Sequence, residues 1–585
     1  MCLRAPRQDV AVRVGRTLAL CFLLASLAQA ASRPTLRGLG GAVSSDDPYA
    51  TAAGLAMLRA GGNAVDAAVA TALALAVTYP EAGNLGGGGF AVVRMGGELA
   101  ALDFREVAPA GANSRMYLDE EGRPIPYSSL VGPLASGVPG SSAGLWELHQ
   151  RFGKLPWKQV VEPARRLASE GFVVSRWLSD RLWADRFLLG RFEETRAVWF
   201  RDGQVLRPGT HLELPDLART LAEYAEKGPA ALHSGRVAEA IVAASRRHGG
   251  ILTAADLAAY RPAWRQPLVS RAFGWELAGM PLPSSGGVIL AETAALLERL
   301  GWAATPRLGS DRAHLLAESF RRAFRDRFDL GDPSTTQATP QDLLAPSHLA
   351  ARAASVDRHR ATPSGELAGI DSIQREPTET THLSVVDGEG NLVALTTTLN
   401  ALFGCGLYVP GAGFFLNNEM DDFAAAPGKP NLFGLIQGEA NAVAPGKRML
   451  SSMSPTLAWR GREAIAVGGR GGSLIPTHTA QVLFNVIVDG DTLEEAIGRP
   501  RLHHQWLPDE IRIEPDTLVP EVKVELQRRG HRLKVRVATA KVNAVRLRAD
   551  GTVEAAGEPR GSGSPGVVRR LAGEGGLAEP RTDGF

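Results

Sequence analysis

The spacing of apolar residues predicts helices along much of the chain before residue 330. Residues 50–77 are rich in Ala, Leu and Met and predict two helices separated by Gly61-Gly62-Asn63, and residues 146–171 and 217–248 also have helical character. Residues 310–328 predict a long helix, and its many arginines at helical spacing are expected to form a solvated face.

From residue 380 onward the pattern becomes that of β-strands. Residues 383–386 and 392–399 are two strand-like runs joined by the turn signal Asp387-Gly388-Glu389-Gly390-Asn391. A hairpin that pivots at Glu389 places Thr380 opposite Thr398. Directly opposed side chains have Cβ atoms about 4.5–5.5 Å apart, so the two hydroxyls are expected to share a hydrogen bond.

Two glycine-rich segments are expected to have different roles. Residues 84–90 lead into a strand at residues 91–95, whereas a phosphate-binding glycine loop opens a helix, so close backbone packing is the favoured interpretation. Residues 468–473 separate a strand at residues 464–467 from a helix at residues 477–488. Such a loop presents backbone N–H groups to negative charge, and the lack of a Lys-Ser or Lys-Thr pair disfavours phosphate.

Two segments are expected to lie outside the packed core. The polar stretch at residues 346–379 contains Pro363, Gly365 and Pro377, and we expect it to be exposed and mobile. The glycine-rich end, residues 561–585, is expected to be disordered.

The first thirty residues have the features of an export signal. Four arginines precede a short apolar run at residues 18–27, and Ala28-Gln29-Ala30 offers small residues for cleavage. A membrane anchor is the alternative, but the run is short for a bilayer. We therefore expect cleavage after Ala30 and an exported protein, periplasmic or secreted, without a stable membrane anchor.

Composition and charge fit a globular protein, with 44% apolar and 22% charged residues in 585. The formal net charge of +2 becomes 2 − 3 = −1 without the signal segment, which carries four arginines and one aspartate. This near-neutral balance gives no reason to expect binding to nucleic acid. Cys2 and Cys21 leave with the signal, so Cys405 remains alone and no internal disulfide is expected. We interpret Cys405 as a small loop residue and not as a nucleophile.

Several sequence blocks in a fixed order resemble those of the γ-glutamyltranspeptidases, and together they are far more specific than any one motif. They fall between about residues 41 and 560 and comprise Leu102-Asp103-Phe104-Arg105-Glu106, Pro283-Ser284-Ser285-Gly286-Gly287, the run from Thr380 to Asp387, Thr398-Leu399-Asn400, Leu416-Asn417-Asn418-Glu419-Met420-Asp421-Asp422-Phe423, Ser451-Ser452-Met453-Ser454-Pro455-Thr456 and His503-His504-Gln505-Trp506-Leu507-Pro508.

This resemblance implies an α+β fold of the N-terminal-nucleophile hydrolase type, a four-layer αββα sandwich in which two stacked sheets lie between helical layers. It also implies a precursor that cuts itself between Glu379 and Thr380. With the signal peptide at residues 1–30, the large subunit then spans residues 31–379 and the small catalytic subunit residues 380–585.

The resemblance makes Thr380 the nucleophile. A threonine hydroxyl needs an adjacent base, and the cut supplies one in the freed α-amine, whose pKa is about 7.7–8.0. Thr398 stands at the family position that orients the Thr380 hydroxyl, and Gly471 with Gly472 is expected to form the oxyanion hole.

A γ-glutamyl substrate carries two charges that need partners. For its α-carboxylate the resemblance assigns Arg105, Ser451 and Ser452. For its α-ammonium it assigns Asn400, Glu419 and Asp422.

Two positions depart from the family pattern. Gly469-Arg470 stands where relatives have Ser-Pro before the paired glycines, which adds charge and chain freedom beside the oxyanion loop. Residues 427–434 resemble the lid of the lidded members, with Phe433 where a tyrosine is common. Loss of that hydroxyl is expected to loosen closure and admit other acceptors.

No metal and no cofactor are expected. His503 and His504 are adjacent on a strand and point to opposite faces, so they do not easily share an ion. His382 lies close to the nucleophile, but its side chain is expected to be structural.

The expected function is that of a γ-glutamyl hydrolase and transferase acting on glutathione and similar compounds, with water, amino acids or peptides as acceptors. One alternative is a cephalosporin or glutaryl acylase of the same fold that uses the same Thr380. Another is a homologue that binds γ-glutamyl ligands without turnover.

Overall fold

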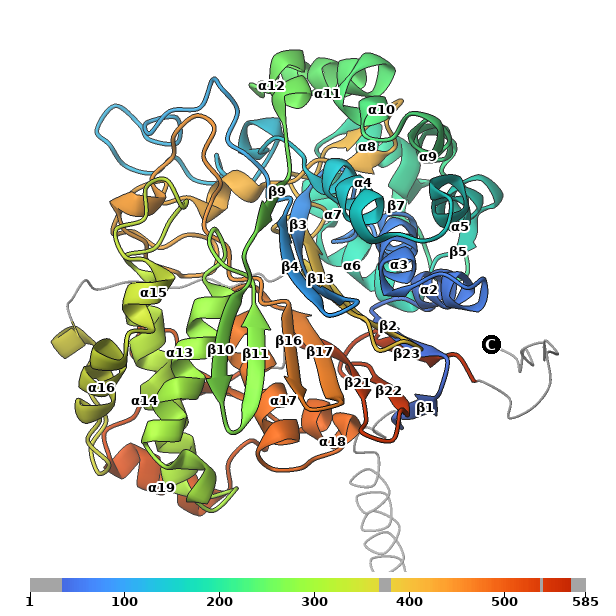
Figure 1. Ribbon diagram of the computed structural model, residues 1–585. Coiled ribbons are helices and arrows are strands. Elements are labelled where there is room, and N and C mark those ends of the chain that lie inside the picture. Colours follow the sequence, from blue (N-terminus) through green and yellow to red (C-terminus); the bar gives the residue numbers. More distant parts are fainter. Residues whose placement is uncertain (1–33, 368–379, 537–539, 570–585) are drawn as a thin grey trace, which may run out of the picture.

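The computed structural model describes residues 34–367, 380–536 and 540–569 (Figure 1). The expectations for the signal segment and for Glu379 concern residues outside these ranges. Helices and strands combine in a mixed α/β architecture built on two seven-stranded sheets.

The first sheet contains Thr380 and is antiparallel throughout. Its strand order is β23-β2-β12-β13-β3-β4-β9. The bounds are β2 Gly41–Ser45, β3 Gly88–Met95, β4 Glu98–Asp103, β9 Ala263–Arg265, β12 Thr380–Asp387, β13 Leu392–Thr398 and β23 Ser564–Val567.

Two predictions from the sequence concern strands of this sheet. The register of β12 and β13 places Thr380 opposite Thr398, which confirms the predicted hairpin. Disorder from residue 561 onward is wrong for the first residues of that segment, because β23 pairs with β2 at the edge of the sheet. The sequence of this strand, Ser-Pro-Gly-Val, lacks the apolar alternation by which a strand is recognised. Its position depends on backbone pairing with β2 more than on apolar side chains. Residues 570–585 are outside the described ranges.

The second sheet has the order β1-β22-β21-β17-β16-β11-β10. Its strands are β1 Leu36–Gly38, β10 Leu268–Ala272, β11 Trp275–Gly279, β16 Thr456–Arg460, β17 Glu463–Arg470, β21 Lys541–Leu547 and β22 Val553–Ala556. The expected loop at residues 468–473 is shorter than predicted, because Gly468, Gly469 and Arg470 continue β17 and pair with β21.

Smaller sheets of two or three strands and 3₁₀ turns lie outside the two large sheets. The strands are β5 Phe172–Val173, β6 Phe200–Arg201, β7 Gln204–Val205, β8 His211–Leu212, β14 Tyr408–Val409, β15 Phe414–Phe415, β18 Leu502–His503, β19 Ile511–Ile513 and β20 Leu533–Val535. The turns are η1 Pro133–Ala135, η2 Trp302–Ala304, η3 Ser364–Leu367, η4 Glu419–Asp422, η5 Glu439–Asn441 and η6 Gly472–Leu474.

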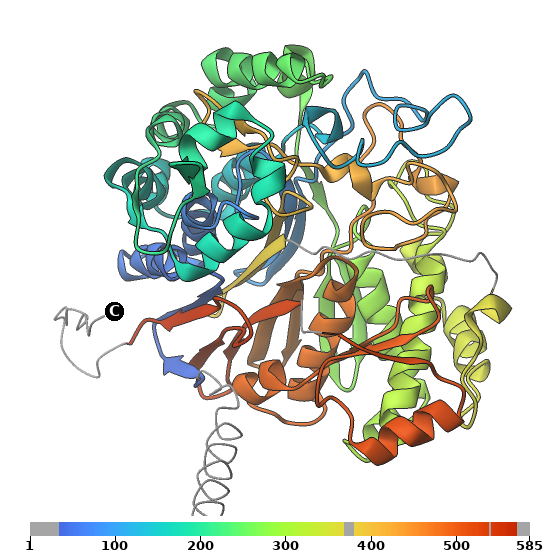
Figure 2. The same cartoon turned by 180° about the vertical axis from the view of Figure 1, so that it is seen from behind.

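Helices gather in two groups, one on each side of the paired sheets, as the opposite views of Figures 1 and 2 agree. The group packed near the first sheet comprises α2 Pro48–Arg59, α3 Ala64–Thr78, α4 Ser141–Phe152, α5 Trp157–Glu170, α6 Arg176–Ala184, α7 Arg186–Leu189, α8 Glu193–Trp199, α9 Pro215–Lys227, α10 Ala230–His233, α11 Gly235–Arg247 and α12 Ala254–Ala259. The other group comprises α13 Gly286–Arg299, α14 Ser310–Arg327, α15 Pro340–Leu343, α16 Pro346–Ala354, α17 Ile475–Ile487, α18 Leu493–Gly498 and α19 Pro520–Arg528.

Three apolar layers hold these elements together. Between the sheets, Phe90 and Val92 from the first pack with Leu457 and Val545 from the second. A larger cluster joins the first sheet to α2, α3 and their neighbours, and another joins the second sheet to α13, α14 and α17. Burial of apolar area in these layers is the main favourable contribution to folding.

The predicted helix at residues 310–328 is present as α14, but the expectation of a solvated arginine face is wrong. Arg321, Arg322 and Arg327 are buried. Arg322 Nη1 donates to Glu318 Oε2 at 2.7 Å, and Arg322 Nη2 donates to the Ser355 carbonyl at 2.7 Å. Buried charges require such partners. Glu318 lies one turn before Arg322 in the same helix, whereas Ser355 belongs to a later segment that periodicity does not place.

The expectation of a loose segment from residue 346 is also wrong for its described part. Residues 346–354 form α16, which begins with Pro346 at a position where a proline N–H is not needed. Ser364 is buried, and its hydroxyl donates to the Trp506 carbonyl at 2.6 Å. The chain is therefore anchored at least as far as η3.

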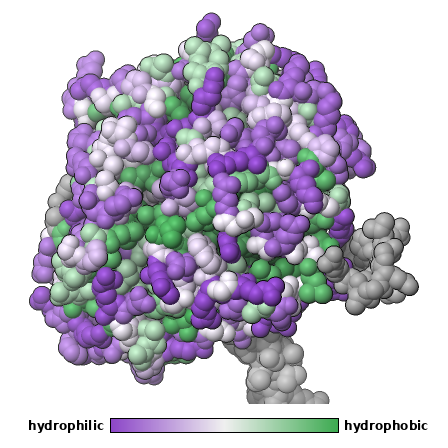
Figure 3. Space-filling view, in the orientation of Figure 1, coloured by the Kyte–Doolittle hydropathy of each residue, from purple (hydrophilic) through white to green (hydrophobic). Residues whose placement is uncertain are grey.

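The surface is mixed in character. Figure 3 shows hydrophilic residues around the rim of one face and a band of hydrophobic residues across its middle. Among the described residues, none of the helices combines the length and the apolar character needed to cross a membrane.

Candidate active site

A pocket lies where the two sheets meet at the first residue of β12. Its walls come from η4, the loop before β16, and the start of α17, in addition to the hairpin. The lining residues are Thr380, Thr398, Asn400, Glu419, Asp422, Phe433, Ser451, Ser452, Met453, Gly472 and Ile475. Nine of the eleven residues predicted for the site and its lid are among them, and Arg105 and Gly471 are not.

Thr380 and Thr398 face one another across two central strands of the sheet. The Thr380 hydroxyl donates to Thr398 Oγ1 over 3.4 Å, and both residues are buried. Thr398 Oγ1 also accepts the Asn400 backbone N–H at 2.8 Å. The second threonine is thus fixed by the turn that follows it and holds the first in orientation.

The backbone beside Thr398 is packed too closely for side chains. A Cβ at Gly87 would collide with the Thr398 carbonyl oxygen and with the Asn84 side chain. Asn84 Nδ2 in turn donates to the Thr398 carbonyl at 2.8 Å. This is the close backbone packing predicted for the glycine segment at residues 84–90.

Asn400 occupies the turn at the end of β13 with a φ of 75°, a left-handed value that asparagine tolerates better than most residues. Its Nδ2 donates to the Asn418 carbonyl at 2.9 Å. The turn therefore sets the Asn400 amide in the pocket wall beside η4.

Arg105 binds the two acidic residues of the pocket from behind. Its guanidinium is fully buried and donates through separate nitrogens to Glu419 and to Asp422, while Nε donates to the Met449 carbonyl at 3.2 Å. Sequence reasoning placed Arg105 with the serines and the two acids in a separate group. In this structure the arginine and the acids form one cluster, and Arg105 is not part of the pocket wall.

Burial and the charge of Arg105 act in opposite directions on the carboxyls of this cluster. Burial raises the pKa of Glu419 well above its usual value and raises that of Asp422, against the opposing effect of Arg105. Burial also raises the pKa of the neighbouring Glu106 to about 7. Because these carboxyls interact, they take up and release protons as a group.

Two polar atoms in the pocket wall have no hydrogen-bond partner among the described residues. One is Glu419 Oε2, an acceptor, and the other is the hydroxyl of Ser452. Buried polar groups are rarely left unpaired, so each is available to a ligand. The acceptor suits an ammonium group and the hydroxyl suits a carboxylate.

The expected oxyanion loop reaches the pocket at Gly472. Gly471 and Gly472 have φ values of 133° and 55°, and the chain then passes through η6 into α17. Gly472 lines the pocket together with Ile475, the first residue of α17. The positive end of the helix dipole therefore lies close to Thr380, where negative charge on a substrate oxygen is stabilised.

Phe433, the residue at the lid position, closes one side of the pocket. A Cβ at Gly472 would meet the Phe433 ring, so the two are in contact. Two hydrogen bonds attach the lid loop to η4. The Leu432 N–H donates to Asp421 Oδ2 at 3.0 Å, and Asn431 Nδ2 donates to Asp422 Oδ1 at 3.4 Å.

Arg470 extends away from the pocket into a buried polar layer. Its Nε lies 3.4 Å from Asp46 Oδ2, and its guanidinium lies over the rings of Tyr79 and Trp177. Asp46 also accepts the hydroxyl of Thr381, the residue after Thr380, at 3.0 Å. Arg470, which departs from the family pattern, therefore contacts Asp46, a residue that holds β12 in place.

Arg327 was missed by sequence reasoning. It is fully buried at the end of α14, and its Nε donates to Ser285 Oγ at 3.0 Å. Ser285 Oγ donates to the Ser451 carbonyl at 2.7 Å, so Arg327 supports the serine wall. Burial lowers the pKa of Arg327 to about 10, partly offset by Asp422. The only signal was its place in a helix whose arginines suggested a solvated face.

The histidines and the cysteine have local partners. His382 Nδ1 and Nε2 contact Thr396 Oγ1 and Ser384 Oγ at 2.8 and 2.9 Å, and burial lowers its pKa to about 3. His503 contacts Thr477 and Gln505, and His504 accepts the Trp506 N–H. Burial raises the pKa of the Cys405 thiol to about 11, as expected for an inert side chain.

Comparison with known proteins follows this geometry. The family model for gamma-glutamyltranspeptidase matches residues 50–568. A glutathione hydrolase proenzyme from Pseudomonas aeruginosa is 43% identical over 572 residues, which cover 95% of this chain and 99% of the relative. Its counterpart from Escherichia coli is 41% identical over 533 residues, covering 90% and 91%.

A solved structure extends the likeness to three dimensions. The cephalosporin acylase from Bacillus halodurans superposes with a TM-score of 0.80 at 27% identity, over 92% of this chain and 98% of the acylase. The family match spans most of the chain and includes every residue placed in the pocket. The chain belongs to the γ-glutamyltranspeptidase family.

Proposed function

We propose that this protein hydrolyses and transfers γ-glutamyl groups from glutathione and similar compounds. The observation that carries the proposal is a paired threonine hydroxyl in one pocket with an acceptor, Glu419 Oε2, and a donor, Ser452 Oγ, that have no partner within the described part of the chain. The relatives named as glutathione hydrolases support the same substrate class.

The reaction begins with attack by Thr380 Oγ1 on the γ-carbonyl carbon. The free α-amine of Thr380 accepts the hydroxyl proton, and Thr398 keeps the hydroxyl oriented. Negative charge that develops on the carbonyl oxygen is stabilised by the backbone N–H groups of Gly471 and Gly472 at the start of α17. The proton passes to the leaving amine, and a γ-glutamyl ester remains on Thr380.

Water or an amine then resolves this ester. Attack on the same carbonyl carbon releases glutamate when water is the acceptor, or a new γ-glutamyl amide when an amino acid or peptide is the acceptor. The α-amine takes a proton from the attacking water or amine and delivers it to Thr380 Oγ1 as the ester bond breaks. The α-amine acts as base and then as acid in each half of the cycle.

Recognition uses the two charges of the glutamyl group. Its ammonium is placed against Glu419, Asp422 and the Asn400 amide, and its carboxylate against Ser451 and Ser452. In this arrangement Arg105 fixes the acids and reaches the carboxylate by exchanging one of its carboxylate partners. An arriving ammonium favours that exchange, because it compensates the acid that the guanidinium releases.

Maturation supplies the base. We propose a cut between Glu379 and Thr380 that divides the precursor into a large subunit, residues 31–379, and a small subunit, residues 380–585, after export to the periplasm or beyond. The assembled pair then forms the four-layer αββα sandwich of N-terminal-nucleophile hydrolases. Two sheets in contact, each packed against its own helices, support this description.

Acylase activity on cephalosporin or glutaryl substrates is the alternative, favoured by the likeness to the Bacillus halodurans enzyme. A glutaryl group lacks the α-ammonium, so it leaves Glu419 and Asp422 without a partner. Comparison of γ-glutamyl and glutaryl anilides on the same preparation separates the two. We expect a strong preference for the γ-glutamyl compound, and equal rates would favour the acylase.

The decisive experiment is the N-terminal sequence of the smaller fragment of the purified protein, together with turnover of a γ-glutamyl anilide. We expect the fragment to begin at Thr380 and Thr380→Ala to remain a single inactive chain. An uncut yet active wild-type chain would refute the mechanism. A cut but inactive chain would favour a protein that binds γ-glutamyl ligands without turnover.

A further inference from the structure

Two buried carboxyl groups and a partly exposed histidine lie together between α13, α14 and α16, and none of them lines the pocket. Glu292 comes from α13, Asp326 from α14 and His348 from α16. One ligand atom from each lies within 4.8 Å of the others. The three helices lie side by side at the outer edge of the molecule in Figure 1.

Asp326 already has cationic and polar partners. Arg352 Nε donates to its Oδ2 at 3.0 Å, and Arg352 Nη2 donates to Oδ1. His348 Nε2 donates to Oδ2 at 2.8 Å. One arginine therefore balances one carboxylate of the pair.

Glu292 has no such balance. It is fully buried, and within the described part of the chain neither of its carboxylate oxygens accepts a hydrogen bond. Burial raises its pKa well above the usual value, and the charge of Asp326 raises it further. Two adjacent buried carboxyls do not both stay ionised unless a proton or a cation lies with them.

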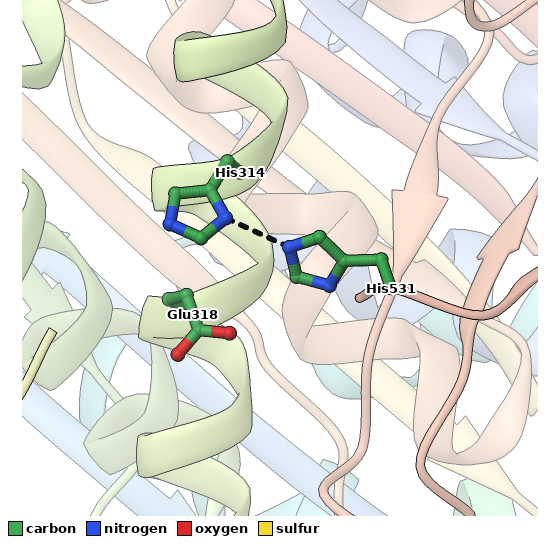
Figure 4. A group of neighbouring side chains, drawn as sticks. All are labelled: His314, Glu318 and His531. Atoms are coloured by element: carbon green, nitrogen blue, oxygen red, sulfur yellow. Dashed lines mark hydrogen bonds between the residues drawn. The ribbon is translucent and has the colours of Figure 1, made fainter. Parts of the chain in front are cut away.

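A second cluster provides a contrast. Figure 4 shows His314, Glu318 and His531, in which His314 Nδ1 and His531 Nε2 share a hydrogen bond of 2.7 Å. Both oxygens of Glu318 are occupied, one by Arg322 Nη1 at 2.7 Å and the other by Arg321 Nε and the Thr362 N–H, each at 3.2 Å. Both carboxylate oxygens of Glu318 thus have donors, whereas among the described residues neither oxygen of Glu292 has one, although the charges of Arg352 and Arg322 act on it.

We propose that Glu292, Asp326 and His348 bind one divalent transition-metal cation, Zn²⁺ or Mn²⁺. Two carboxylates and one imidazole are a ligand set that suits such ions. His348 Nε2 lies 2.8 Å from Asp326 Oδ2 and 4.0 Å from Glu292 Oε1. These distances bracket the roughly 3.3 Å between two ligand atoms of a tetrahedral zinc ion, so only small side-chain movements are needed.

Proton balance is simple at this site. The ion replaces the proton between His348 Nε2 and Asp326, and the imidazole takes up its proton on Nδ1 instead. If Glu292 is protonated beforehand, its proton is released to water. The His348 side chain is 27% exposed and gives the ion a route from solvent.

Such an ion would tie three helices that support the serine wall of the pocket. Asp326 directly precedes Arg327, which donates to Ser285 immediately before α13, and Ser285 holds the Ser451 carbonyl. The importance of this link for substrate binding rests on the proposed function. Metal binding itself does not, and a direct titration measures it independently of catalysis.

The test uses the tag-free processed protein after treatment with a chelator. Titration calorimetry and metal analysis with Zn²⁺ and Mn²⁺ are expected to find one saturable equivalent per chain and a higher melting temperature with the ion bound. Ca²⁺, which prefers oxygen ligands, is expected to bind much more weakly. A wild-type protein that takes up neither transition metal overturns the proposal and leaves a shared proton as the balance for Glu292.

Variants locate the ion. Glu292→Gln keeps the side-chain volume and removes the charge, so it is expected to fold, as checked by circular dichroism, and to lose the bound equivalent. His348→Gln, at a partly exposed position, is expected to lose it as well. His531→Gln, in the cluster of Figure 4, is the matched control and keeps it. Retention by Glu292→Gln, or loss confined to His531→Gln, contradicts the assignment.

Discussion

At the scale of single residues, the site depends on hydrogen bonds that leave some polar atoms free. Thr398 Oγ1 accepts from both Thr380 and the Asn400 backbone, so its lone pairs are used and it acts as an orienting acceptor. Glu419 Oε2 and Ser452 Oγ remain open to a ligand. The occupied atoms fix the geometry, and the open atoms select the substrate.

Removing the orienting hydroxyl tests this division. Thr398→Ala is expected to lower kcat for a γ-glutamyl anilide about fivefold, because a single hydrogen bond contributes about 1 kcal/mol. Thr398→Ser retains the hydroxyl and is expected to stay within a few fold of wild type. If the serine variant is as slow as the alanine variant, then the methyl group and its packing matter more than the hydrogen bond.

His382 provides a prediction about pH. Burial lowers its pKa from 6.5 to about 3, so below pH 6.5 the unfolded chain binds a proton that the folded chain does not. This residue therefore removes stability as pH falls from 6.5 towards 3. His382→Gln is expected to be less stable than wild type at pH 7.5, by an amount that shrinks at pH 5.

Urea unfolding at the two pH values measures this difference. His211→Gln, at an exposed position, is the control and is expected to show the same small difference at both. A deficit of His382→Gln that is unchanged between pH 7.5 and pH 5 would show that His382 is protonated equally in both states.

At the scale of elements, β12 is held from two sides and from behind. It pairs with β2 and β13, and the Thr381 hydroxyl bonds to Asp46, which also accepts from Asn543 Nδ2 at 3.0 Å. Arg470 on β17 supplies the positive charge next to Asp46. The second sheet thus stabilises the strand that begins with Thr380.

Breaking that ion pair is expected to be costly. Arg470→Met leaves Asp46 buried beside an apolar side chain, and we expect a loss of about 3 kcal/mol in the free energy of unfolding. Asp46→Asn in the same chain removes the stranded charge, so the double variant is expected to be more stable than Arg470→Met alone. Chemical denaturation of the single and double variants measures this, and additive losses would contradict the pairing.

The sequence predicted the hairpin best because its turn residues and its alternation are local signals, and they fix the register of Thr380 and Thr398. It placed the helix α14 but failed for the burial of its arginines and for the order of α16, because part of their surroundings comes from distant segments. The arginines of α14 look solvent-facing until Glu318, Asp509 and the Ser355 carbonyl are placed beside them. The sequence blocks that resemble the γ-glutamyltranspeptidases located the pocket residues, but only the structure shows that Arg105 contacts Glu419 and Asp422 directly.

At the scale of the whole molecule, each sheet is built from segments on both sides of Thr380. β2, β3 and β4 precede it and β12 and β13 follow it in the first sheet, while β10 and β11 precede it and β16 and β17 follow it in the second. The two products of a cut at Thr380 would share every apolar layer between them.

The fragments are therefore expected to stay together after processing. Size-exclusion chromatography in native buffer should give one peak containing both pieces in equal amounts, and denaturant should separate them. Elution in two native peaks would mean that the sheets do not hold the halves as their pairing indicates.

The pairing of β2 with β12 places Ser44 opposite Ser384 and Val43 opposite Val385. The residues of each pair are separated by more than half the length of the chain. Contacts over such sequence distances form late, since a long loop must close before they contribute. The contacts around Thr380 therefore form only after most of the chain on both sides of it has been synthesised and folded. Self-cleavage at that residue would then report completed folding, and incompletely synthesised chains would remain without a nucleophile.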